Sequence, residues 1–155
     1  MKILMVCLGN ICRSPLAEGI LKDKVRRRKL NWEVDSAGTG YWHVGEGPDP
    51  RSVAIARQNG IDIRDQRARQ LLAKDLEEYD LIFAMDTQNY QQIRRMASDS
   101  RQEGKIHLIM DLVHPGAGYS VPDPYYDDHG FEGVFQMLDD ACEKIVTRWK
   151  ENGEG

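Results

Sequence analysis

The sequence has no apolar run that approaches the roughly 18 residues that a membrane-spanning helix needs. The apolar stretch of residues 1–8 is too short for a signal peptide. Basic residues are not in excess, since 21 Lys and Arg stand against 25 Asp and Glu. The positively charged surface typical of nucleic-acid-binding proteins is therefore not expected. We predict a protein that neither enters a membrane nor binds nucleic acid.

Cysteine is also scarce. The chain has three cysteines, and this odd number does not fit the paired disulfides of small secreted domains. Thiol chemistry in the reducing cytoplasm is the better match, so we expect a cytoplasmic protein. The roles of Cys7, Cys12 and Cys142 then need an explanation.

The length suits one domain. A chain of 155 residues can bury about 68–70% of its unfolded surface without disulfide support. Hydrophobic residues make up 41% and charged residues 30%, which is ordinary for a globular protein. No internal repeat or linker divides the sequence, and we expect a single domain over residues 1–155.

Apolar runs alternate with stretches of helical periodicity along the chain. The expected strands are residues 2–7, 32–37, 79–85 and 106–110. The expected helices are residues 14–29 with Ser14 as N-cap, 49–60 ending in a Gly60 C-cap, 73–78, 86–96, and a last helix from about residue 130. This alternation predicts an α/β fold of parallel strands with right-handed crossovers. In such doubly wound sheets ligands bind beyond the carboxyl ends of the strands.

The last helix has the clearest periodicity, because its apolar residues recur every three or four positions. They are Phe131, Val134, Phe135, Leu138, Cys142, Ile145, Val146 and Trp149. A buried cysteine commonly acts as a small apolar side chain. We therefore expect Cys142 to fill the core.

The loop after the first strand, Cys7–Pro15, combines residue types that suit a phosphate. It leads into a helix, whose unpaired N–H groups and partial positive charge attract anions. Gly9 and Asn10 tolerate left-handed backbone angles, which let successive N–H groups converge. Arg13 offers a planar fork that matches two phosphate oxygens. The same positive surroundings favour a thiolate at Cys7, placed to attack a bound phosphorus.

A second segment, Pro122–Tyr126, offers a proton donor. An aryl phosphate needs a proton on its leaving oxygen, from the side opposite the nucleophile. The two prolines favour an extended backbone at Asp123, and a nearby phosphate dianion would help to keep its carboxyl protonated. Tyr125 and Tyr126 can wall a pocket for an aromatic ring. By itself the segment is equally compatible with a proline-rich turn and two packing tyrosines.

With both segments in view, the chain resembles the low-molecular-weight protein tyrosine phosphatases. The resemblance rests on residues 6–15 and 123–126, together with residues 35–39, 48–51, 68–70 and 85–86 between them. It spans essentially the whole chain. It implies a sheet of four parallel strands in the order 2-1-3-4, flanked by helices, and an enzyme that needs no metal or other cofactor.

The resemblance also implies catalytic roles for three residues. Cys7 would be the nucleophile and would form a phosphocysteine intermediate. Arg13 would bind the phosphate and stabilise the transition state. Asp123 would protonate the leaving phenol and then activate the water that hydrolyses the intermediate.

Further residues of the resemblance concern the loop and the substrate. Asn10, Ser14 and Ser36 would hold the loop in shape by hydrogen bonds, and Ser14 would also help the thiolate to depart. The residues expected to bind substrate are Leu8, Gly9, Asn10, Ile11, Cys12, Ser14, Trp42, Tyr125 and Tyr126.

Three positions refine the comparison with the family. Relatives that act on phosphoarginine tend to have a threonine where this chain has Ile11, so the isoleucine favours phosphotyrosine. Cys12 matches a second loop cysteine that is thought to form a reversible disulfide with the nucleophile, and a neighbouring thiol can capture an oxidised Cys7. A packing role is the alternative for Cys12. Some relatives support the loop with a histidine where this chain has Gln66-Arg67, so that contact is in doubt.

The expected partners are tyrosine-phosphorylated proteins or peptides, and inorganic phosphate is expected as product and inhibitor. The protein itself is expected to be a monomer or a weak dimer. The alternatives are an arsenate reductase on the same scaffold, a cysteine phosphocarrier, and an inactive phosphotyrosine-binding module. Residues 81–90 lack the additional cysteines that a reductase would use. Arg13 and Asp123 argue against a carrier, and the intact set with Cys7 argues against an inactive module. Asp86 is expected to cap a helix rather than to act as an acid.

Overall fold

The computed structural model describes residues 1–150, so the last five residues of the expected domain lie outside the described residues. Four parallel strands form one sheet in the order β2-β1-β3-β4. They are β1 (Lys2–Cys7), β2 (Glu33–Gly38), β3 (Leu81–Ala84) and β4 (Ile106–Leu108). The predicted α/β class and strand order are confirmed.

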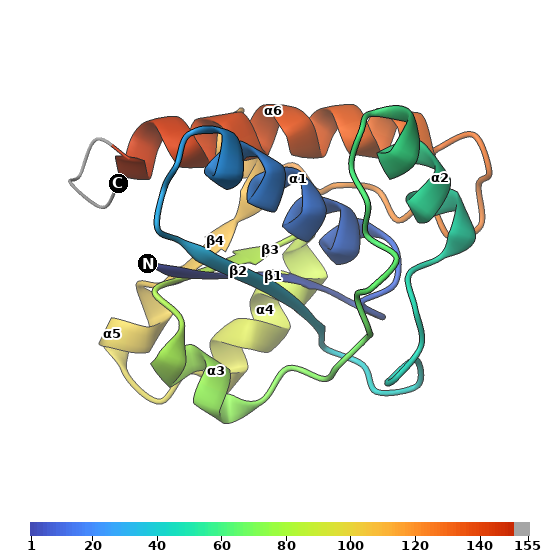
Figure 1. The fold of residues 1–155 in the computed structure, drawn as a ribbon. Coiled ribbons are helices and arrows are strands. Elements are labelled where there is room, and N and C mark those ends of the chain that lie inside the picture. The colour runs from blue at the N-terminus through green and yellow to red at the C-terminus, as the bar shows by residue number, and fades with distance from the viewer. Residues whose placement is uncertain (151–155) are drawn as a thin grey trace.

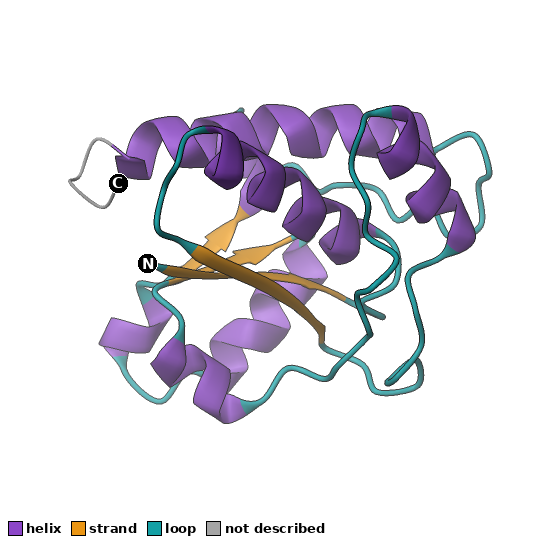
Figure 2. Ribbon diagram, viewed as in Figure 1, coloured by secondary structure: helices purple, strands orange, loops and turns teal. Residues whose placement is uncertain are grey.

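Helices cover both faces of the sheet (Figures 1 and 2). One face carries α1 (Arg13–Arg27), α2 (Pro50–Gln58) and α6 (Phe131–Trp149). The other carries α3 (Ala73–Glu78), α4 (Thr87–Met96) and α5 (Ser100–Glu103), and a 3₁₀ turn, η1 (Ile109–Leu112), follows β4. Coverage of both faces explains why the central strands β1 and β3 are apolar nearly throughout rather than alternating, whereas the edge strand β2 carries Glu33 and Asp35.

The core is divided by the sheet, because successive side chains of a strand point to opposite faces. Ile3 and Met5 of β1 belong to the larger cluster on the α1–α6 side, and Leu4 and Val6 belong to the smaller one on the α4 side. Cys142 is fully buried in the larger cluster. Burial raises the pKa of its thiol well above the ordinary value, and the prediction that it fills the core is confirmed.

Some predicted boundaries are wrong. Ser14 does not cap the first helix, which begins at Arg13 with Cys12 in the cap position; the Ser14 hydroxyl turns toward Cys7 instead. The second helix is capped by Asn59 rather than Gly60. The predicted strands 32–37, 79–85 and 106–110 are found at 33–38, 81–84 and 106–108, because pairing with neighbouring strands decides where a strand begins and ends.

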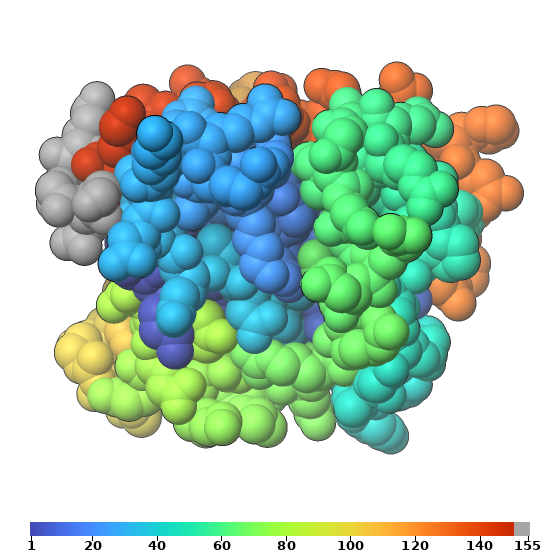
Figure 3. Space-filling view, viewed as in Figure 1, coloured from blue at the N-terminus to red at the C-terminus, as the bar shows by residue number. Residues whose placement is uncertain are grey.

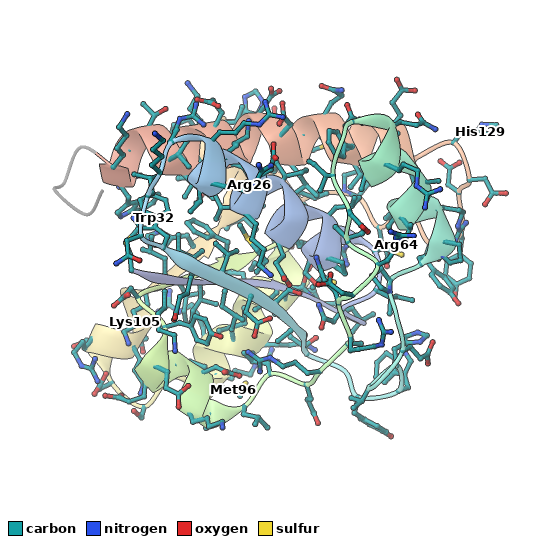
Figure 4. The ribbon with its side chains drawn as sticks, in the orientation of Figure 1. Arg26, Trp32, Arg64, Met96, Lys105 and His129 are labelled. Atoms are coloured by element: carbon teal, nitrogen blue, oxygen red, sulfur yellow. The ribbon has the colours of Figure 1, made fainter. Side chains whose placement is uncertain are left out.

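The strand order determines where a ligand can bind. Because β2 and β3 lie on opposite sides of β1, the loop that follows β1 opens at a topological switch point. Trp32 and Lys105 directly precede β2 and β4, and Figure 4 shows them at the amino end of the sheet, away from that loop. Within residues 1–150, every helix is too short or too polar to span a bilayer.

Candidate active site

Residues 7–13 form a loop at the carboxyl end of β1, which we call the cradle. Asn10 adopts the left-handed φ of 58°, and its N–H lies 3.3 Å from Cys7 Sγ. Gly9, expected to be left-handed as well, is not, and it serves a different need. A Cβ at Gly9 would lie 3.0 Å from the His43 ring, and a Cβ at Gly38 would lie 2.8 Å from the Leu8 carbonyl oxygen.

The Asn10 amide organises the hydrogen bonds behind the cradle. Its Oδ1 accepts the Arg69 backbone N–H at 3.0 Å, and its Nδ2 donates to Ser14 Oγ at 2.8 Å and to Ser36 Oγ at 2.9 Å. Since a backbone N–H can only donate, the orientation of the amide is fixed. Ser14 Oγ lies 3.0 Å from Cys7 Sγ. Because Ser14 Oγ accepts from the Asn10 amide, the Ser14 proton is free to be donated to the sulfur.

A buried carboxylate completes this network. Glu18 is 3% exposed, accepts the Ser36 hydroxyl at 2.6 Å, and receives Lys22 Nζ at 2.6 Å. Burial raises the pKa of Glu18, although Lys22 and Ser36 oppose that shift. Sequence reasoning missed Glu18; the available signal was an acidic residue within the apolar face of the first helix, with Lys22 four positions on.

Arg13, the last residue of the cradle, is buried. Its Nη1 donates to Asp86 Oδ2 at 2.7 Å and to the Val121 carbonyl at 3.0 Å. Burial works against its charge, but the charges of Cys7 and Asp86 outweigh this and the pKa of Arg13 is raised. A guanidinium held in this way is a permanent cation with a fixed direction.

Asp86 has two functions, of which one was predicted. Its Oδ1 accepts the Asn89 N–H at 2.7 Å and caps α4, as expected. Its Oδ2 binds Arg13, which sequence reasoning missed. Its position directly after β3, one strand from the cradle, was the signal that could have indicated this.

Asp123 stands on the open side of the site. Its Oδ2 lies 3.8 Å from Arg13 Nη2, and 45% of its side chain is exposed. Its Oδ1 accepts the Tyr125 N–H at 3.1 Å. The side chain is therefore directed toward the cradle but is free enough to meet a ligand.

The cradle and Asp123 share one cavity of about 380 Å³. It is lined by Cys7, Leu8, Gly9, Ile11, Cys12, Arg13, Trp42, His43, Asp123, Tyr125 and Tyr126. Asn10, Ser14 and Ser36 do not line it and belong to the support behind it. Most of the predicted substrate-binding residues thus meet at one surface.

His43 is a cavity residue that sequence reasoning missed. Its ring centroid lies 6.3 Å from that of Tyr125, and its Nδ1 lies 3.1 Å from Glu46 Oε2. The only signal was its position next to Trp42. It narrows the mouth between the cradle and the tyrosines.

Cys12 lies in the cradle wall, with no disulfide to either other cysteine. Burial, and next the charge of Asp49, raises the pKa of its thiol to about 12. Cys12 therefore stays protonated at neutral pH. Within residues 1–150, no group of three or more His, Cys, Asp and Glu side chains could hold a metal ion.

The segment of residues 60–72, which leads from α2 toward α3, supports the cradle from outside; it is the green segment beside α1 in Figure 3. Gln66 Nε2 donates to the Pro15 carbonyl at 3.1 Å, so it binds the first turn of α1. The contact with the cradle itself comes from the backbone of Arg69, through Asn10. The Gly38 N–H donates to the Arg69 carbonyl at 2.8 Å and ties the segment to β2.

The chain is similar to known proteins. The family model described as low molecular weight phosphotyrosine protein phosphatase matches residues 2–154. A low molecular weight protein-tyrosine-phosphatase of Bacillus subtilis is 40% identical over 147 residues, covering 94% of this chain and 93% of its own length.

Solved structures agree. A protein tyrosine phosphatase of Entamoeba histolytica, crystallised with Hepes in its active site, superposes with a TM-score of 0.91 at 36% identity, covering 99% of each chain. A Drosophila arginine phosphatase superposes with a TM-score of 0.90 at 35% identity, covering 97% of this chain and 98% of its own. On its sequence, its fold and its site, the chain belongs to the low molecular weight phosphotyrosine protein phosphatase family.

Proposed function

We propose that this chain hydrolyses phosphotyrosine through a phosphocysteine intermediate on Cys7, as a single domain over residues 1–155. The observation that carries the proposal is that a thiol, a buried guanidinium and a half-exposed carboxyl meet in one cavity. These are Cys7, Arg13 and Asp123, the nucleophile, anion-binding group and proton donor that the reaction requires.

In the first step, the Cys7 thiolate attacks phosphorus and an S–P bond forms. The bond between phosphorus and the phenolic oxygen breaks, and that oxygen takes the proton of the Asp123 carboxyl. Arg13 and the backbone N–H groups of the cradle bind the three remaining phosphate oxygens as charge spreads over them. Asp86 keeps the Arg13 fork in position.

In the second step, the Asp123 carboxylate takes a proton from water, whose oxygen attacks phosphorus. The S–P bond breaks and the electron pair returns to Cys7 as a thiolate. The Ser14 hydroxyl, held by Asn10, donates a hydrogen bond to that sulfur as it departs. Inorganic phosphate is released, and because it fits the same cradle it would also inhibit.

The mouth of the cavity favours an aryl group. Trp42, Tyr125 and Tyr126 supply aromatic walls, and Ile11 adds an apolar surface where a threonine would be expected for phosphoarginine. Tyrosine-phosphorylated proteins are therefore the proposed substrates. Since one similar structure is a Drosophila arginine phosphatase, phosphoarginine is the competitor to test.

Cys12 is proposed as a redox guard for Cys7. Its protonated thiol does not compete as a nucleophile, but it lies in the same wall and can form a disulfide with an oxidised Cys7. A reducing compartment such as the cytoplasm would reduce this disulfide and restore both thiols.

The test is phosphate release from matched phosphotyrosine and phosphoarginine peptides. We expect hydrolysis of the first, unaffected by a chelator, with phosphorus captured on the enzyme by acid quench. Cys7→Ser should abolish both release and capture, whereas Cys142→Ala should retain them at 25 °C. Full activity of Cys7→Ser would overturn the mechanism, preference for phosphoarginine would overturn the substrate, and a captured intermediate that water does not hydrolyse would indicate a phosphocarrier.

A further inference from the structure

The segment that carries Asp123, residues 121–128, is anchored to the body at both ends; we call it the acid segment. At its first residue, the Val121 N–H donates to the Met85 carbonyl at 2.8 Å, and the Val121 carbonyl accepts Arg13 Nη1 at 3.0 Å. This anchor uses Arg13, so it cannot be removed without disturbing the phosphate site.

The second anchor is Arg51, in the first turn of α2. Its Nη2 donates to the Tyr125 carbonyl at 2.8 Å, and its Nη1 forms an ion pair with Asp128 at 2.5 Å. The guanidinium also lies over the Phe131 ring, 4.6 Å from its centroid. Arg51 therefore contacts the backbone of Tyr125, the side chain of Asp128 and the first residue of α6, Phe131.

Arg51 is itself fixed to the cradle. Its Nε and Nη2 bind the two carboxylate oxygens of Asp49 at 3.0 and 2.9 Å. Asp49 is the N-cap of α2, and its N–H donates to the Ile11 carbonyl of the cradle at 2.8 Å. A continuous path of hydrogen bonds thus runs from Ile11 through Asp49 and Arg51 to Tyr125.

Asp123 depends on these anchors because little else holds it. Its side chain is 45% exposed and its separation from Arg13 is 3.8 Å, longer than a hydrogen bond. Pro122 and Pro124 stiffen the backbone on either side. Pro124 is buried and packs against the body, but a proline has no N–H with which to hydrogen-bond it. The position of the carboxyl is then set by where residues 121 and 125 are held.

We propose that Arg51 is a positioning residue that keeps Asp123 at the distance from the cradle needed for proton transfer. Arg51 does not line the cavity, so it acts through the acid segment and not on the substrate. The inference rests on the proposed function, in which Asp123 is the proton donor.

The test compares a poor leaving group, phenyl phosphate, with a good one, 4-nitrophenyl phosphate. Arg51→Met keeps an apolar stem over Phe131 and removes the hydrogen bonds. We expect kcat/KM, which covers only the steps through release of the phenol, to fall about 10-fold or more with phenyl phosphate, since small misplacements of a reacting group are costly. It should fall less than about 3-fold with 4-nitrophenyl phosphate, which needs less protonation. Arg57→Met, on the exposed side of the same helix, is the matched control and should change neither.

A double-mutant cycle with Asp123→Asn separates positioning from general destabilisation. Once the carboxyl is lost, Arg51→Met should cost less than about a further 2-fold with phenyl phosphate. Equal losses on both substrates, or losses that multiply in the double variant, would overturn the positioning role. If Asp123→Asn itself shows no dependence on the leaving group, the proton donor of the proposed function is wrong and the inference falls with it.

Two further measurements keep the outcome clear. Inhibition by inorganic phosphate should be unchanged in Arg51→Met. An inhibition constant weakened as much as kcat/KM would show that Arg51 acts through the cradle instead. Asp128→Ala, which removes one Arg51 partner whose side chain is 79% exposed, should produce the same selective loss to a smaller degree. If this variant matches the wild-type enzyme while Arg51→Met fails to fold, the inference is refuted.

Discussion

The two halves of the site are built in opposite ways. The cradle is buried, with Cys7 2% and Arg13 3% exposed, and hydrogen bonds from Asn10, Ser14 and Asp86 hold it. The acid segment is open, and Tyr126 within it is 94% exposed. Hydrogen bonds hold the cradle from behind, whereas the acid segment is held at Val121, Tyr125 and Asp128 and by the buried Pro124, with exposed side chains between these points.

The difference matches what each half must do. The phosphate geometry is the same for every substrate, so donors fixed in advance avoid reorganisation during the reaction. In the proposed function the leaving group is a tyrosine within a polypeptide, and it enters a cavity that the acid segment lines with Asp123, Tyr125 and Tyr126. A half-exposed proton donor on an anchored but open segment meets that requirement.

The largest expected effect is in the fixed half. Arg13→Lys keeps the charge, but an ammonium cannot bind phosphate, Asp86 and the Val121 carbonyl together. We expect kcat/KM to fall about 10³-fold on good and poor leaving groups alike. Arg26→Lys, at an exposed position, is the control. If Arg13→Lys lowered kcat/KM by less than 10-fold, the cradle would not depend on the fixed guanidinium.

The next effect belongs to the open half. Asp123→Ala should lower kcat/KM, which covers the steps through release of the leaving group, about 10²-fold with a poor leaving group and far less with a good one. Because the side chain is half exposed, the melting temperature should hardly change. Asp127→Ala, in the same segment, is the control. A comparable loss on both leaving groups would contradict a proton-donor role.

Asp86→Asn tests the contact that holds Arg13, which itself donates to the Val121 carbonyl of the acid segment. Asparagine can still cap α4, but it loses the charge that binds Arg13. A hydrogen bond between charged groups contributes about 1.5–3 kcal/mol, so kcat/KM should fall about 10- to 100-fold. Asp99→Asn, at the N-cap of α5, should leave the rate unchanged. Equal rates for the two variants would remove Asp86 from the site.

The smallest effect concerns stability and pH. The pKa of Glu18 is raised in the folded chain. The protonated Glu18 therefore adds to the free energy of unfolding in full below its ordinary pKa of 4.5, and this stabilisation is lost as the pH rises through the pKa of the folded chain. Glu18→Gln imitates the protonated form, and its melting temperature relative to wild type should rise from acid to neutral pH. Although burial opposes it, Lys24 and Arg28 lower the pKa of Glu143, so Glu143→Gln should show the opposite trend. Parallel trends would refute this account.

The fold could be predicted because each local signal agreed with the others. The strand at residues 2–7 and the helix at residues 73–78 have the predicted bounds. Errors occurred at ends that tertiary contacts decide. Ser14 has the chemistry of an N-cap, but in the fold its hydroxyl has Asn10 and Cys7 as partners, and only the folded chain brings these together.

The site was predictable where its residues are adjacent in sequence, as in the cradle and around Asp123. The missed residues act across long separations. Glu18 reaches Ser36, Asp86 reaches Arg13, and Arg51 reaches the backbone of Tyr125. A carboxylate at the start of a helix is explained by capping, and an arginine on a helix surface by solvation. Their long-range partners are therefore visible only in the three-dimensional structure.

The hydrogen bond from the Arg69 backbone to the Asn10 side chain has a consequence for spectroscopy. The Arg69 backbone N–H lies in a segment between helices, 59 positions from its acceptor. It is protected from solvent exchange only while Asn10 keeps the orientation that leaves the Ser14 proton free for Cys7. Its rate of exchange with deuterated solvent therefore reports how often the cradle opens. A single resonance, remote from the sulfur, would follow the readiness of the nucleophile without any substrate present.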